Sequence, residues 1–183
     1  MSTTFRFPEY EETLNLLCQH DARPQDFLRL AYQYAWTFSH DPKTKNGSVL
    51  ITKSGRLFYG CNHLPRGIEV TDEIMSTPAL KDPLITHAEV DVIMKAARAG
   101  VSTQDSVMFC CWAPCVPCAS RIIEAGVGTL IVHKQMHMRT YEKYLASIET
   151  AIGYLKRARV AYEAFDGYIG GCQGLMSNEV WEP

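Results

Sequence analysis

The sequence predicts a single-domain α/β protein whose central sheet is covered by helices on both faces. Short apolar runs alternate with longer segments in which apolar residues recur every three or four positions, the pattern of strands alternating with amphipathic helices. The chain has 183 residues, which is enough for one well-buried core and short for two. No internal repeat or linker interrupts it. We therefore expect one domain over residues 1–183.

The first part of the chain is expected to hold two helices and a β-hairpin. Spaced leucines predict a helix in Tyr10–His20, and a proline separates it from a second helix at about Gln25–Ser39. Residues 1–24 would then form an N-terminal helical extension. Two short apolar runs follow, Val49–Ile51 and Leu57–Tyr59, with turn residues between them. These runs predict the two strands of a hairpin.

The rest of the chain is expected to begin with a long loop, because residues 65–86 are polar and contain several prolines. A short helical turn fits within this loop, and Thr86 could cap the helix that follows it. Helices and strands then alternate, and we expect them at His87–Arg98, Ser106–Cys111, Pro117–Ala125, Thr129–Val132, Thr140–Arg157 and Val160–Phe165. A Gly-rich and polar tail, 166–183, completes the chain.

Composition argues against several functional classes. A net charge of −2 offers no strong field for a polyanion, so we do not expect a nucleic acid partner. No apolar run is long enough to span a membrane and no apolar signal core begins the chain, so we expect a cytoplasmic protein without a membrane anchor. Seven cysteines, an odd number without a secretory signal, favour reduced thiols and metal ligands over disulfides.

The strongest chemical signal is His87-Ala88-Glu89, followed twenty-five residues later by Pro114-Cys115-Val116-Pro117-Cys118. One imidazole and two thiolates give a tetrahedral Zn²⁺ three protein ligands and leave the fourth position for water, as in catalytic zinc sites. The pair of motifs matches the known H-x-E and P-C-x-x-C signature of nucleobase deaminases. We therefore expect His87, Cys115 and Cys118 to bind zinc.

Deamination of an aminopyrimidine requires hydroxide to add to the ring carbon that bears the amino group. Zinc lowers the pKa of bound water from 15.7 to roughly 7 and so supplies that nucleophile, which attacks C4. Glu89 would carry one proton to the ring nitrogen and another to the departing amine. The alternatives are a redox dithiol for the cysteines and a helix-stabilising role for Glu89. Asn62 could contact a sugar hydroxyl or could be a turn residue.

The chain resembles the deoxycytidylate (dCMP) deaminases of the cytidine-deaminase superfamily. Beyond the zinc motifs, Ser39–Val49 is similar to the family's S-x-D-P-x-T-x-V-G-A-V segment, and Gly60–Gly67 resembles its G-Y-N-G-x-P-x-G loop. The resemblance implies a three-layer α/β/α sandwich with a central, mostly five-stranded mixed sheet. It also implies hydrolytic deamination of dCMP to dUMP and ammonia, with Glu89 as proton shuttle.

The resemblance also suggests substrate contacts. It implies that Asn62 contacts the sugar, and that the backbone near Ala88 and of Trp112-Ala113-Pro114 holds the base. We add Asn46 to the expected substrate site. Five cations near predicted pocket loops are candidates for a phosphate, and we select Lys45 and Arg66 from the set Lys43, Lys45, Arg66, Lys134 and Arg139.

Further implications concern assembly and regulation. The resemblance implies a homo-oligomer, dCTP and dTTP as effectors, and Mg²⁺ as the companion of a nucleotide effector. We expect one zinc per chain, because no cysteine or histidine lies between Gly67 and His87. The sequence departs from the family pattern at Asn46-Gly47-Ser48, at Cys61, at His63 in place of a glycine, and at Asp91 in place of an asparagine.

Several other functions share these residues. A related deaminase could act on dCTP, 5-substituted dCMP, cytidine or guanine, since such enzymes differ in the pocket walls. A tRNA or DNA base deaminase would need a basic track for a strand. A non-catalytic zinc module would need no proton shuttle, and its structural site would need a fourth protein ligand.

Overall fold

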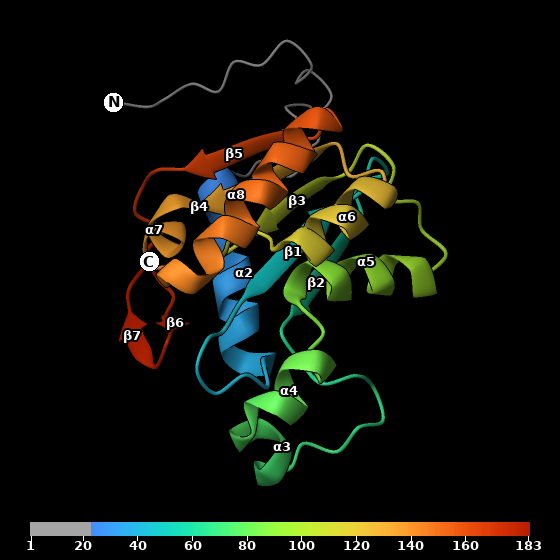
Figure 1. Ribbon diagram of the computed structural model, residues 1–183. Coiled ribbons are helices and arrows are strands. Elements are labelled where there is room, and N and C mark those ends of the chain that lie inside the picture. Colours follow the sequence, from blue (N-terminus) through green and yellow to red (C-terminus); the bar gives the residue numbers. More distant parts are fainter. Residues whose placement is uncertain (1–22) are drawn as a thin grey trace.

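Five strands form the central sheet of the computed structural model, which describes residues 23–183 (Figure 1). Their order across the sheet is β2-β1-β3-β4-β5. The strands are β1 (Gly47–Ile51), β2 (Leu57–Cys61), β3 (Val107–Cys110), β4 (Thr129–His133) and β5 (Ala161–Phe165). The β1 strand pairs antiparallel with β2 and β3, whereas β3, β4 and β5 run parallel. The prediction of a five-stranded mixed sheet is confirmed.

Helices cover both faces of this sheet. On one face lie α5 (Ala88–Arg98), α6 (Val116–Glu124) and α8 (Glu142–Arg157), and on the other lies α2 (Pro24–Phe38) (Figure 1). Successive strand residues point to opposite faces, so Met108 packs with the three helices and Phe109 packs with α2. Two apolar cores result, one on each side of the sheet, and the predicted three-layer sandwich is confirmed.

Most expected elements are present near their expected bounds. The predicted hairpin is β1 and β2, and its register pairs Ile51 with Leu57. The first predicted helix, Tyr10–His20, lies outside the described residues. Cys61, Cys110 and Cys111 are buried free thiols. Within residues 23–183, every helix falls short of the length and apolar character that a membrane crossing requires.

The predicted long loop is wrong in part, because two short helices, α3 (Asp72–Ser76) and α4 (Pro78–Leu84), occupy much of it. Pro78 does not break α4, since a proline is tolerated in the first turn, where its missing N–H has no helical partner. The two helices form a lobe at the lower edge of the molecule (Figure 1). This lobe contributes one wall of the cavity described below.

Three further expectations need correction. Thr86 does not cap α5, because the N-cap is His87 and Thr86 instead pairs with His63 through backbone hydrogen bonds. A short helix, α7 (Lys134–Met138), precedes α8. The tail after β5 contains a second, two-stranded sheet made of β6 (Gly174–Met176) and β7 (Glu179–Trp181). Each of these two strands is only three residues long, which is too short for the alternation of apolar and polar residues to be recognised in the sequence.

Candidate active site

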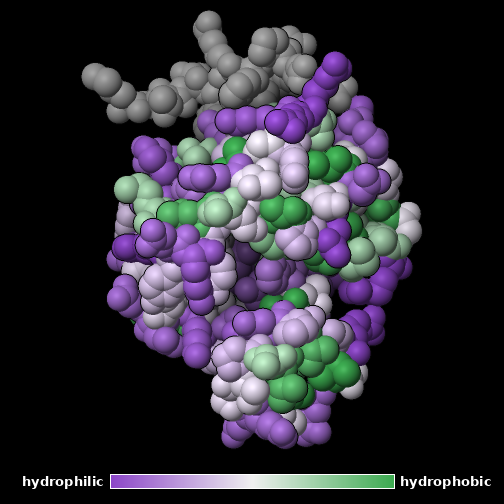
Figure 2. Space-filling model, viewed as in Figure 1, coloured by the Kyte–Doolittle hydropathy of each residue, from purple (hydrophilic) through white to green (hydrophobic). Residues whose placement is uncertain are grey.

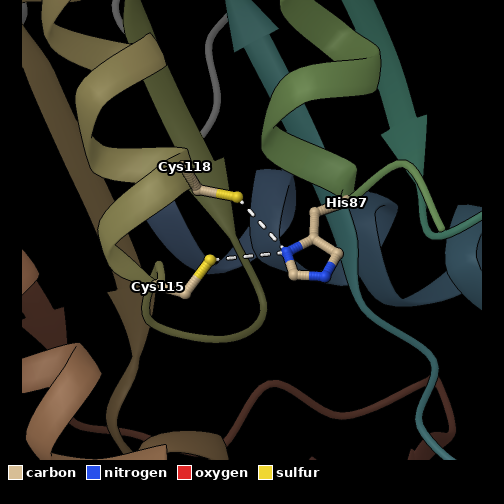
Figure 3. A group of neighbouring side chains, drawn as sticks. All are labelled: His87, Cys115 and Cys118. Carbon is tan, nitrogen blue, oxygen red and sulfur yellow. Dashed lines mark hydrogen bonds between the residues drawn. The ribbon is translucent and has the colours of Figure 1, made fainter. Parts of the chain in front are cut away.

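The three predicted metal ligands come together at the starts of two helices. His87 is the N-cap of α5, Cys115 is the N-cap of α6, and Cys118 lies in the first turn of α6. The His87 Nδ1 atom is 3.3 Å from Cys118 Sγ and 3.6 Å from Cys115 Sγ. Figure 3 shows both sulfur atoms turned toward the same ring nitrogen. The two helices therefore bring together side chains that lie about thirty residues apart in sequence.

These distances fit one zinc ion. With Zn–N near 2.0–2.1 Å and Zn–S near 2.3 Å, a tetrahedral site requires N···S separations of about 3.6 Å. The three ligand atoms all lie within 4.8 Å of one another, and no other group of three or more potential ligands occurs in the described part of the chain. The donor set of one nitrogen and two sulfurs is the set that zinc prefers.

One thiol of the pair is strongly acidified. A hydrogen bond from Cys118 and the neighbouring His87 imidazole lower the pKa of Cys115 to about 4, although burial opposes this. The hydrogen bond with Cys115 raises the pKa of His87 to about 9. A thiolate is thus favoured at Cys115, and thiolate is the form of cysteine that binds metals.

Glu89 lies beside this group in a buried position. Its side chain is 2% exposed, and Asn46 Nδ2 donates a hydrogen bond of 3.4 Å to Glu89 Oε2. Burial raises the pKa of Glu89, and the charge of His87 partly offsets this rise. A carboxyl group whose pKa is moved toward neutrality can both accept and release a proton in the working pH range.

Two buried asparagines fix the backbone around Glu89. Asn62 Oδ1 accepts a hydrogen bond from the Ala88 N–H at 3.1 Å, and Asn46 Oδ1 accepts one from the Trp112 N–H at 3.1 Å. Asn62 follows β2 and Asn46 precedes β1. Each side-chain oxygen therefore links one end of a strand to a segment at one of the two zinc motifs. The Ala88 amide is consequently engaged with Asn62, and Ala88 itself is completely buried. The sequence pattern gave no sign of the contacts of Asn46 with Glu89 and Trp112.

His87, Glu89 and Cys115 line a cavity of about 440 Å³. In the view of Figure 2 the surface is hollowed between the main body and the lobe of α3 and α4. The lining includes Asn46, Asn62, Trp112 and Ala113 among the predicted substrate residues. Aromatic rings form part of the wall, since Tyr144 packs edge-on against Trp112 with centroids 5.8 Å apart. The volume is in the range of small-molecule sites.

The predicted phosphate-binding residues are mostly placed elsewhere. Lys45 is not part of the lining, because its Nζ donates to the Ser39 carbonyl at 2.9 Å. Arg66 is exposed on the loop after β2 and also lies outside the lining, as does the buried Pro114. Of the five cations named as candidates, Lys43 alone lines the cavity.

Sequence reasoning missed several residues of the cavity wall. They come from α4, from the start of α8 and from the β6–β7 turn, and they include Lys81, Tyr141, Lys143, Ser177 and Asn178. None belongs to a recognisable motif, and the last four follow the second cysteine by more than twenty residues. Only the tertiary fold brings them to the site.

Comparisons with known proteins agree with this geometry. A family model described as the cytidine and deoxycytidylate deaminase zinc-binding region matches residues 21–134. The deoxycytidylate deaminase of Mus musculus is 28% identical over 152 residues, which are 78% of this chain and 79% of that protein. The deoxycytidylate deaminase of Schizosaccharomyces pombe is 25% identical over 130 residues, 66% of this chain but only 39% of that protein.

A solved structure shares the fold. The dCMP deaminase of the cyanophage S-TIM5, in complex with dCMP and dUMP, superposes with a TM-score of 0.60 at 21% identity. The superposition covers 88% of this chain and 100% of that chain. The fold is thus common to both proteins.

Proposed function

Because this chain belongs to the cytidine and deoxycytidylate deaminase family, we propose that its substrate is dCMP and its products are dUMP and ammonia. The chain is a zinc-dependent aminohydrolase of the dCMP deaminase type. The observation that carries the proposal is that the group His87, Cys115 and Cys118 meets a cavity that His87, Cys115 and buried Glu89 line. The named activity of the mouse relative supports dCMP as substrate.

His87, Cys115 and Cys118 would hold the zinc ion through Nδ1 and two sulfurs. When bound, zinc lowers the pKa of a water molecule to roughly 7 and so makes a nucleophile available at neutral pH. Three protein ligands leave one position of a tetrahedron for that water. The α6 helix begins at the two cysteines, and its N-terminal dipole favours their thiolate forms.

Glu89 would move the protons of the reaction. A carboxylate oxygen would accept one proton from the attacking water and deliver it to N3 of the pyrimidine ring. It would then take the proton of the hydroxyl group added at C4 and deliver it to the departing amino group, so that ammonia leaves and C4 becomes a carbonyl carbon. The raised pKa of Glu89, caused by burial, suits both transfers. Asn46 holds the carboxylate through Oε2, which fixes the direction from which the proton is delivered.

The roles of the remaining predicted substrate residues follow from which of their hydrogen-bonding groups are not already used within the protein. Asn62 uses Oδ1 for the Ala88 amide, so its NH₂ group is available for a sugar hydroxyl. The Ala88 amide therefore orients Asn62 and does not contact the base. We propose that the base contacts the cavity wall formed by Trp112 and Ala113, and that the neighbouring buried Pro114 supports this wall.

A substrate panel tests the proposal. Ammonia release by zinc-loaded protein would be measured with dCMP, 5-substituted dCMP, dCTP, CMP, deoxycytidine and guanine. We expect the highest kcat/KM with dCMP. If another member of the panel gives a higher kcat/KM, that compound and not dCMP is the preferred substrate. If zinc-loaded protein releases ammonia from none of the compounds, the proposed deamination is refuted.

Other features stay predictions, made from the resemblance or from the sequence alone. They are the homo-oligomer, the dCTP and dTTP effectors with Mg²⁺, a single zinc ion per chain and a cytoplasmic location. Light scattering at several protein concentrations tests the homo-oligomer. Turnover of dCMP with added dCTP or dTTP, with and without Mg²⁺, tests the two nucleotide effectors.

A further inference from the structure

The C-terminal hairpin reaches the catalytic cavity with its turn. Ser177 and Asn178 connect β6 to β7 and have φ values of 58° and 70°. A two-residue loop with both φ angles positive is the type I′ turn, whose twist matches that of a hairpin. Both turn residues line the cavity that also contains His87 and Glu89. The tail of the chain thus supplies part of the substrate site.

Three hydrogen bonds hold this turn against the segment that precedes β1. The Lys45 N–H donates to the Leu175 carbonyl at 2.9 Å, and the Asn178 N–H donates to the Lys43 carbonyl at 2.9 Å. The Ser177 N–H donates to Thr44 Oγ1 at 3.1 Å. The backbone amides of the turn are therefore occupied. The Ser177 hydroxyl and the Asn178 side-chain amide make no hydrogen bond within residues 23–183.

The other end of the hairpin is anchored in the core. The Trp181 ring stacks on His133 with centroids 5.7 Å apart and an interplanar angle of 11°. The Arg139 guanidinium lies 4.2 Å from the centroid of Trp181. Leu175 and Met176 are buried. A turn held at both ends presents its side chains to the cavity with little loss of conformational freedom on binding.

Both lysines and carboxylates line the cavity to which this turn contributes, and the carboxylates are Asp41, Asp82 and Glu89. Lys43, Lys81 and Lys143 all line the cavity. Lys81 is neutralised by Asp41 at 3.0 Å and Asp82 at 3.7 Å. Lys43 and Lys143 form no salt bridge with any residue between 23 and 183, although Lys143 lies over the ring of Tyr144 at 4.7 Å. Among the described residues, these two cations at the cavity therefore lack a counter-charge.

We propose that Lys43, Lys143 and the Ser177–Asn178 turn form the subsite that selects substrates with an anionic 5′-phosphate. The inference rests on the proposed function and assigns phosphate selectivity largely to residues beyond 134, where the family match ends. A phosphate monoester carries about two negative charges and accepts several hydrogen bonds. Two ammonium groups, a hydroxyl and a primary amide supply donors of the kind that bind it.

The ratio of kcat/KM for dCMP to kcat/KM for deoxycytidine tests the subsite. The double variant Lys43→Met/Lys143→Met keeps the aliphatic stems and removes both charges. We expect it to lower the ratio by roughly 10- to 100-fold or more, as expected for lost hydrogen bonds to charged groups. Lys156→Met, on the last turn of α8 and outside the cavity, is the matched control and should leave the ratio unchanged.

The turn is tested separately by Ser177→Gly/Asn178→Gly. Glycine accepts positive φ without strain, so the hairpin should form while both polar side chains are lost. The same ratio should fall by roughly threefold or more, in keeping with the weaker hydrogen bonds of neutral donors. An unchanged ratio in the double-lysine variant overturns the subsite, even if kcat/KM falls equally for dCMP and deoxycytidine.

A binding measurement separates the subsite from the proposed reaction. Calorimetric titration with dUMP and with deoxyuridine needs no turnover. Wild-type protein should bind dUMP more tightly than deoxyuridine, and the double-lysine variant should lose this preference. If wild-type protein deaminates neither dCMP nor deoxycytidine, the proposed function fails, yet this binding difference still decides the subsite. Equal affinity of the wild-type protein for dUMP and deoxyuridine would refute the phosphate subsite.

Discussion

His63 Nε2 lies 3.0 Å from Asp91 Oδ1, and this contact joins two positions at which the sequence departs from the family pattern. Asp91 Oδ2 accepts a hydrogen bond from the Cys61 N–H at 3.1 Å and pairs with Lys95 at 2.7 Å. The Asp91 side chain is 2% exposed. The cluster connects the end of β2, next to Asn62, to the helix that carries Glu89.

This cluster predicts a pH dependence of stability. The hydrogen bond with Asp91 raises the pKa of His63, so the stabilisation by His63 is fully present below about pH 6.5, its usual pKa. The stabilisation is lost as pH rises through the raised pKa. Burial acts to raise the pKa of Asp91, but hydrogen bonds from His63 and Lys95 hold it below its usual value. Asp91 therefore stays ionised throughout this range.

We expect His63→Ala to lower the free energy of unfolding of zinc-loaded protein by about 1 kcal/mol at pH 6, a modest value because His63 is partly exposed. The difference from wild type should shrink when urea unfolding is repeated at pH 9. His137→Ala, which removes a histidine that makes no salt bridge within residues 23–183, controls for loss of an imidazole. A difference that stays constant or grows with pH would contradict the assigned role.

Gly60→Ala should disturb the packing of β2 against α5. A Cβ at position 60 would lie 2.5 Å from the Ala88 carbonyl oxygen and 2.8 Å from the Val92 nitrogen, so strand and helix must separate. We expect a loss of about 1–3 kcal/mol in the free energy of unfolding together with lower turnover, since α5 carries Glu89. Gly153→Ala on α8 meets no atom within 4 Å and should stabilise by about 0.5–1 kcal/mol. Wild-type stability in Gly60→Ala would show that the contact is not tight.

Cys115→Ser should abolish stoichiometric zinc binding and lower thermal stability, because the metal links the starts of α5 and α6. Zinc content would be measured by mass spectrometry after dialysis against a weak chelator. Cys172→Ser is the control, since Cys172 is a half-buried thiol outside the metal-ligand group. Full zinc occupancy in Cys115→Ser would remove Cys115 from the ligand set.

Asn62→Asp separates the two roles of Asn62. The carboxylate still accepts the Ala88 N–H, but it has lost the NH₂ group assigned to the sugar. We expect KM for dCMP to rise by about tenfold, as for one lost hydrogen bond worth about 1.4 kcal/mol, while the thermal midpoint changes little. Asn62→Ala should also lower the midpoint, because the Ala88 N–H then has no acceptor. An unchanged KM in Asn62→Asp would exclude the sugar contact.

The sequence predicted the parts of this protein that local signals encode. Apolar periodicity located α5 and α8 and the hairpin β1–β2, and the two motifs predicted His87, Cys115 and Cys118 as zinc ligands, whose separation in the structure suits one ion. For the lobe of α3 and α4 the sequence predicts a long loop with a short helical turn, because Pro78 and Pro83 favour a break, although proline is compatible with a first turn. Pro83 lies inside α4, one residue before its end, where it removes one i→i−4 hydrogen bond from this seven-residue helix.

The cavity wall could not be predicted in the same way. Lys143 and Asn178 reach the cavity through tertiary packing, and no local spacing relates them to His87. The turn at Ser177 and Asn178 contains no glycine, so the usual hairpin signal was absent although both residues adopt positive φ. The sequence could not show that Lys45 lies outside the cavity lining and that its ammonium group donates to the Ser39 carbonyl.

The central claim is that Glu89 transfers protons beside a zinc ion held by His87, Cys115 and Cys118. The most direct measurement compares ammonia release from dCMP by wild type and Glu89→Gln, each with its zinc content determined. We predict equal zinc content and a loss of turnover of at least about 100-fold in the variant, because glutamine fills the same space and transfers no proton. Turnover close to wild type in zinc-loaded Glu89→Gln would contradict the mechanism.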